Sequence, residues 1–152
     1  MTPFGSVYTL HVLSALVWVG GMFFAHFCLR PVASEILPPF LRLQLLARVL
    51  GRFFKIVAAA IVLILFSGIG RMINVGFASA PLNWHLMMTT GLVMVVIFAV
   101  IYLRKFPNLQ ARVAAEDWPA AGAAMNGIRQ LVAINLGLGV ATMAIACFGV
   151  GF

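Results

Sequence analysis

The sequence is poor in acidic residues, and this shortage excludes several kinds of chemistry. Glu35, Glu116 and Asp117 are its only carboxylate side chains, against ten lysines and arginines, and the net charge is +7. All three lie in the polar connections between long apolar segments. A Ser/His/Asp hydrolase site and a buried carboxylate for proton relay therefore have no candidates, and no glycine-rich loop that could hold phosphate is found.

Charged residues and cysteines are also scarce. Only 9% of residues are charged and 64% are hydrophobic, whereas soluble domains are about 45–50% apolar. The chain is therefore predicted to be an integral membrane protein that contacts the lipid bilayer. It is not expected to bind nucleic acid. Cys28 and Cys147 are expected near opposite membrane faces, which excludes a disulfide between them, and we expect both to be small buried residues.

Four apolar segments are long enough to cross about 30 Å of hydrocarbon, which takes roughly 20 residues. The sequence predicts an all-α integral membrane protein, a four-transmembrane-helix bundle forming one domain over 1–152. Arg30-Pro31 follows the first segment without a small-residue cleavage site, so this segment is expected to be a retained helix. The predicted spans are 6–29, 53–75, 84–103 and 131–151.

Basic residues predict the orientation, because short cytoplasmic loops are rich in lysine and arginine. Nine of the ten border the first and third connections, and only Arg71 belongs to the other half. Both termini are therefore expected outside or in the periplasm, and a periplasm implies the inner membrane of a bacterium. The run "FLRLQLLARVLGRFFK" before the second span predicts an amphipathic segment at the cytoplasmic interface. Asp117 is expected to cap a new helix with Pro119 in its first turn.

Two of the three histidines are predicted at one depth. A polar residue inside a membrane helix is a candidate functional group. His11 and His85 both lie near the outer ends of their spans, whereas His26 lies about 22 Å from His11 along the helix axis. Asn135, within the last span, is expected to form an interhelical hydrogen bond.

The leading hypothesis is a b-type haem bound by two histidines. His11 and His85 would be the axial ligands, in electron transfer or a redox step with quinone or another membrane redox partner. Arg71 would pair with the haem propionates or extend to the interface. Trp18 belongs to the His11 stripe of the first span, whose small residues leave room for a flat cofactor or for helix packing.

Copper is the alternative cofactor. Soft sulfur and imidazole ligands suit Cu(I), and the outer half supplies Met72, Met87, Met88 and Cys147 beside the two histidines. A copper-binding or copper-transport protein is therefore the second hypothesis. The third is an accessory subunit, packed into a larger membrane complex or a homo-oligomer.

The first span carries a family resemblance. "LHVLSALVWVGGMFF" followed by "RP" resembles the copper resistance protein D (CopD) family, as do "TGLVMVVIFAVIYL" and "AAEDWPAAGAAMNGIRQLVAINLGLG". The resemblance implies a membrane protein that handles metal or haem, with His11 as the matched position. The chain is also distantly similar to HemJ-type protoporphyrinogen oxidases, which use a lysine early in the third helix. "NWHLMMTTG" has His85 and no lysine there, which argues against the oxidase activity.

Overall fold

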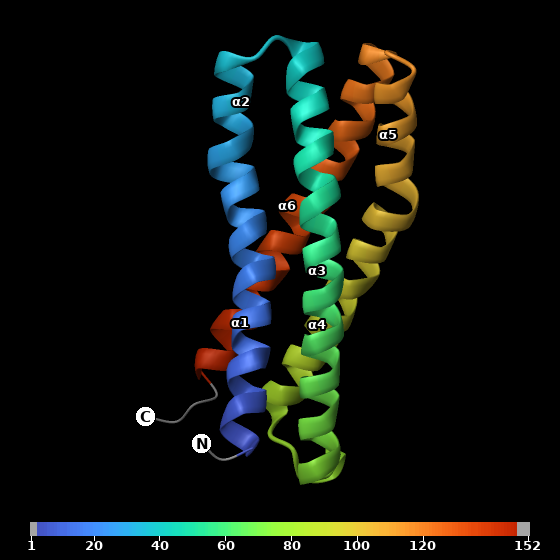
Figure 1. The fold of residues 1–152 in the computed structure, drawn as a ribbon. Coiled ribbons are helices and arrows are strands. Elements are labelled where there is room, and N and C mark those ends of the chain that lie inside the picture. Colours follow the sequence, from blue (N-terminus) through green and yellow to red (C-terminus); the bar gives the residue numbers. More distant parts are fainter. Residues whose placement is uncertain (1–2, 149–152) are drawn as a thin grey trace.

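The computed structural model describes residues 3–148, and over that range the chain contains helices and no strands (Figure 1). The helices form four long rods, because short π-helical turns join some of them end to end. The elements are α1 (Pro3–Phe24), the π-helical η1 (Ala25–Leu29), α2 (Arg30–Ile36), α3 (Pro39–Val75), the 3-10 helix η2 (Phe77–Ser79), α4 (Leu82–Val100), the π-helical η3 (Ile101–Lys105), α5 (Phe106–Ala114) and α6 (Trp118–Phe148).

Each rod is long and apolar enough to cross a membrane, which confirms the predicted fold class. The four spans are Gly5–Ile36, Pro39–Val75, Leu82–Ala114 and Trp118–Phe148. They are longer than predicted, because amphipathic turns continue each helix beyond its apolar part. The predicted end of the last span, at 151, lies outside the described residues.

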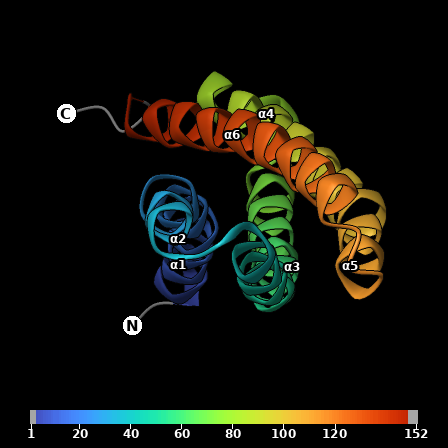
Figure 2. The ribbon, with the colours of Figure 1, turned by 90° about the horizontal axis from the view of Figure 1, so that it is seen from above.

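The rods run alternately up and down. α1 begins, α3 ends, α4 begins and α6 ends at one end of the bundle, which we call the terminal end (Figure 1). The α2–α3 and α5–α6 connections lie at the other, which we call the connection end. α1 packs mainly on α3 and α4 mainly on α6, while α6 crosses over and also contacts α1 and α3 (Figure 2). The first described helix therefore begins, and the last ends, at the same end of the bundle.

Both π-helical turns stand just before a proline. Pro31 and Pro107 are the second residues of α2 and α5, and proline inside an α-helix removes one hydrogen bond and crowds the preceding turn. The wider turn relieves this crowding, because the Arg30 amide donates to the Ala25 carbonyl five residues earlier, and Phe106 donates to Ile101 in the same way. The helices therefore continue through both prolines.

The amphipathic segment before the second span is present but does not lie across the membrane surface. It is the first part of α3, which continues without interruption over 37 residues (Figure 1), about 55 Å at 1.5 Å per residue. No proline interrupts α3 after its first residue, and Leu43, Leu46 and Ala47 are buried against the rest of the bundle. Tertiary packing therefore holds this segment in line with the span.

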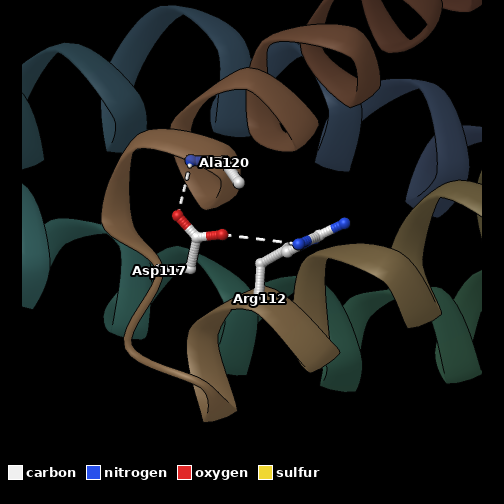
Figure 3. Close-up of polar contacts among 3 residues, drawn as sticks. All are labelled: Arg112, Asp117 and Ala120. Atoms are coloured by element: carbon white, nitrogen blue, oxygen red, sulfur yellow. Dashed lines mark hydrogen bonds and ion pairs between the residues drawn. The ribbon is translucent and has the colours of Figure 1, made fainter.

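Asp117 caps α6, as the sequence predicted. Its Oδ1 accepts a hydrogen bond from the Ala120 amide at 3.2 Å, and its Oδ2 lies 3.4 Å from the Arg112 guanidinium (Figure 3). The preceding Glu116 adopts a positive φ of 54°. The cap and this reversal fix the turn from α5 into α6.

Aromatic rings and one glycine hold the four rods together. Phe54 of α3 packs edge-on against Phe98 of α4. The ring of Trp18 of α1 also packs edge-on against Phe98, with 6.1 Å between the ring centroids. At Gly139 of α6, an added Cβ would lie 2.8 Å from a Val19 methyl and 3.2 Å from the Met94 methyl. α1, α4 and α6 therefore meet at a position where only a hydrogen fits.

Candidate metal site

His11 of α1 is tied to α3 by a hydrogen bond. Its Nδ1 lies 2.7 Å from Ser67 Oγ, and this serine is buried. Ser67 Oγ also lies 2.6 Å from the Leu63 carbonyl and 3.1 Å from the Ile64 carbonyl. Ser67 Oγ donates its single proton in the shorter of these contacts, to the Leu63 carbonyl, and therefore accepts from His11 Nδ1–H.

This arrangement fixes the tautomer of His11. A neutral imidazole carries one proton, so with Nδ1 protonated the lone pair is on Nε2. Metal-binding histidines are oriented in the same way, by a hydrogen bond from the ring nitrogen that does not bind the metal. Gly68 lies beside the ring, and a Cβ there would be in ordinary van der Waals contact with His11 Cε1 at 3.4 Å. His11 is therefore prepared to act as an Nε2 ligand.

His85 of α4 has a different partner. Its Nε2 donates to the Phe77 carbonyl at 3.0 Å and ties the start of α4 to the turn after α3. That turn contains Gly76 at a φ of 85°, a value that glycine adopts without strain. With Nε2 protonated, the lone pair of neutral His85 is on Nδ1. The two histidines share the terminal end of the bundle, but their free lone pairs are on different ring nitrogens. His11 is hydrogen-bonded to α3, and His85 is hydrogen-bonded to the turn after α3.

Arg71 lies beside an aromatic ring. Its guanidinium carbon is 5.2 Å from the centre of the Trp84 ring, in a cation–π contact between the end of α3 and the start of α4. The side chain is exposed. This contact accounts for the position of Arg71 without a haem propionate.

The sulfur residues of the outer half are dispersed. Met72 is buried, Met87 and Met88 are half-buried, and Cys147 is exposed on the outside of the bundle. Cys28 is exposed as well, so the prediction that both cysteines are buried was wrong: each lies on a helix face that no neighbouring helix covers. Within residues 3–148, no group of three or more His, Cys, Asp and Glu side chains could hold a metal. Methionine sulfur is a soft donor that this half of the bundle offers beside the histidines.

Trp18 and Asn135 lie deeper in the bundle. Both line a cavity of about 20 Å³ together with Met22 and Phe54. Trp18 is buried against Phe98, so aromatic packing occupies this part of the His11 stripe. Asn135 is 1% exposed, and its Oδ1 is the one buried side-chain N or O atom in residues 3–148 that has no hydrogen-bond partner. This oxygen therefore does not form the interhelical hydrogen bond expected of Asn135.

Ser67 is the residue of this site that sequence reasoning missed. Its only signal was a lone hydroxyl in an apolar run, directly before Gly68. A serine in a membrane helix commonly bonds back to its own helix, so the partner on α1 could be found only from the packing of α1 on α3.

Comparison with known protein families assigns the chain to one of them. Residues 47–148 match the family described as Copper resistance protein D (CopD). The match covers more than half of the chain, and it begins after α1, so His11 and the motif around it lie outside the matched range. Neither a curated protein nor a solved structure matches the chain, and a similarity to HemJ-type oxidases is not shown. The chain is a four-span membrane protein that belongs to the copper resistance protein D family.

Proposed function

We propose that this protein binds Cu(I) at the terminal end of the bundle, with His11 Nε2 as a ligand, and passes the ion across the membrane. The observation that carries the proposal is the hydrogen bond between His11 and Ser67. It leaves a neutral imidazole with a free Nε2 lone pair inside an apolar bundle, and the family to which the chain belongs is named for copper resistance.

The interior of the bundle favours a soft monovalent ion. Three methionines, Met22, Met72 and Met94, are buried within it, and thioether sulfur prefers Cu(I) to hard divalent ions. The three carboxylates belong to the connection end of the chain, so the apolar path has none. Met22 lies 11 residues from His11 on the same rod, about 16 Å further along the axis, and provides a donor midway through the bundle.

The haem hypothesis receives less support from this arrangement. Two axial ligands must face each other across one iron. His85 Nε2 is instead bonded to the Phe77 carbonyl, and α1 and α4 pack mainly on different neighbours. Binding haem through His85 Nε2 would require the hydrogen bond to the Phe77 carbonyl to break. The proposed electron exchange with quinone would depend on that haem.

Copper binding to the purified protein tests the proposal. In detergent with ascorbate as reductant, we expect stoichiometric Cu(I) binding to the wild type. His11→Leu should lose this binding, and His26→Leu is the matched control because it removes a histidine from the other end of the same rod. Ag(I) should compete with Cu(I).

The same samples distinguish the two hypotheses. Protein from haem-replete cells that shows a Soret band and sharp reduced α and β bands, both lost in His11→Leu, would establish the haem hypothesis instead. Equal Cu(I) binding by the wild type and His11→Leu would overturn the assignment of His11.

A further inference from the structure

Three arginines at the connection end differ from the other basic residues. Of the ten lysines and arginines, seven are exposed, and only Arg30, Arg42 and Arg129 are half-buried. They come from three rods: Arg30 begins α2, Arg42 lies in the first turns of α3, and Arg129 lies in α6. The fold therefore gathers positive charge from distant parts of the sequence.

The three side chains share one region. Arg30 and Arg129 line the same cavity, which has a volume of about 50 Å³. Arg42 belongs to the same end of the bundle, because it lies in the first turns of α3, the helix that α2 contacts. Arg42 also lies near the N-terminus of α3, where the helix dipole is positive. Half-buried like charges repel each other more strongly than exposed ones, so an anion bound among these three arginines would be favourable.

The described part of the chain supplies no anion to the cluster. The one ion pair among residues 3–148 joins Arg112 to Asp117. Glu35, on the same helix as Arg30, is exposed and forms no ion pair there. An anion bound to this cluster would therefore come from another molecule.

The rest of the cavity suits a lipid. Apart from the cluster, its wall is mainly aliphatic, with Leu29, Leu46, Val49 and Ile128 among the lining residues. Arg30 stands where the apolar part of the first span ends, which is the level of lipid headgroups. Guanidinium groups bind phosphate oxygens through paired hydrogen bonds, and basic pockets between membrane helices bind anionic headgroups.

We propose that Arg30, Arg42 and Arg129 form a binding site for the phosphate of an anionic phospholipid, with an acyl chain against the aliphatic wall of the cavity. This site is independent of copper binding at the opposite end of the bundle. It would anchor the α2–α3 and α5–α6 connections to the leaflet that contains the anionic lipid.

Lipid retention tests the proposal. Purified protein is exchanged into mixed phosphatidylglycerol and phosphatidylcholine, and the lipids that stay bound are counted by native mass spectrometry. The wild type should retain phosphatidylglycerol selectively. Retention should weaken about fivefold for each arginine replaced in the series Arg30→Gln, Arg42→Gln and Arg129→Gln.

Two further variants serve as controls for the loss of charge and for misfolding. One control is a triple variant that removes the same charge from exposed positions: Arg48→Gln, Arg52→Gln and Arg104→Gln. It should retain as much phosphatidylglycerol as the wild type. Arg129→Lys keeps the positive charge but loses the planar guanidinium group and its paired N–H donors. This variant should fold normally and retain less phosphatidylglycerol than the wild type. Cu(I) binding at His11 should be unchanged in every variant.

Three results would overturn the proposal. These are equal loss of lipid from the clustered and exposed triple variants, no preference for phosphatidylglycerol in the wild type, or full displacement of the lipid by millimolar inorganic phosphate. The last result would assign the cluster to a free anion.

Discussion

At the scale of the residue, hydrogen bonds decide which atoms are available for chemistry. His11 and Ser67 lie 56 positions apart in sequence, and their 2.7 Å contact fixes the ring nitrogen that remains free. Asn135 shows the opposite case, a buried oxygen left without a partner. Sequence reasoning located all these polar positions except Ser67, but it could not assign partners, because depth along a helix does not determine the direction in which a side chain points.

Ser67→Ala should weaken Cu(I) binding by about 10- to 100-fold, since removing a hydrogen bond that orients a metal ligand has an effect of this size. The ring would lose its fixed tautomer while His11 itself remains. Chelator competition measures the affinity. Ser79→Ala, in the α3–α4 connection, is the control. An unchanged affinity in Ser67→Ala would show that the serine only supports packing.

Asn135→Leu should stabilise the protein by about 1–3 kcal/mol, because it removes a buried acceptor without a partner and the adjoining cavity accommodates the added volume. Thermal unfolding in detergent measures the change. Asn126→Leu, at an exposed position of the same helix, should shift stability by no more than about 0.5 kcal/mol. A lower melting temperature for Asn135→Leu would show that the amide binds a partner such as water.

At the scale of the element, the number and type of helices could be predicted from hydropathy, and their ends and continuity could not. The predicted first and third spans stop near Arg30-Pro31 and Arg104-Lys105, whereas the helices continue through π-helical turns. Hydropathy reports where lipid contact ends, but a helix ends only where its hydrogen bonds cannot be completed. The Asp117 cap was predictable because capping depends on residues close in sequence.

Gly139→Ala should destabilise the bundle by about 1–3 kcal/mol, since the added methyl group would overlap Val19 where three helices meet. Gly137→Ala provides the matched control, because nothing lies within 4 Å of a Cβ at that position. Removing a glycine from a helix should make this control neutral or slightly more stable. Thermal unfolding compares the two variants, and equal effects would contradict the packing described for α1, α4 and α6.

At the scale of the whole molecule, charge divides the bundle into two ends. Nine basic residues belong to the connection half, and Arg71 lies at the terminal end. The fold class followed from composition, because a chain with so few charged residues and four long apolar segments has few other solutions in lipid. The order in which the helices pack did not follow, since α1 on α3 and α4 on α6 depends on side-chain shape rather than on hydropathy.

The charge asymmetry predicts that the terminal end faces the periplasm. In a Cys28→Ser, Cys147→Ser background, a cysteine at Ser79 in the α3–α4 connection should react with an impermeant maleimide in intact cells. A cysteine at Ser34, an exposed position at the connection end, should react only after the membrane is permeabilised. The reverse pattern would invert the orientation and place the His11 site on the cytoplasmic side.

The central claim is that His11 Nε2 binds Cu(I) in this bundle. The X-ray absorption spectrum of the Cu(I)-loaded protein tests it most directly, because it identifies the atoms bound to copper. We predict an imidazole nitrogen and at least one thioether sulfur in the wild type, with the nitrogen contribution lost in His11→Leu and retained in His26→Leu. A copper shell without imidazole nitrogen in the wild type, or one unchanged in His11→Leu, would contradict the account.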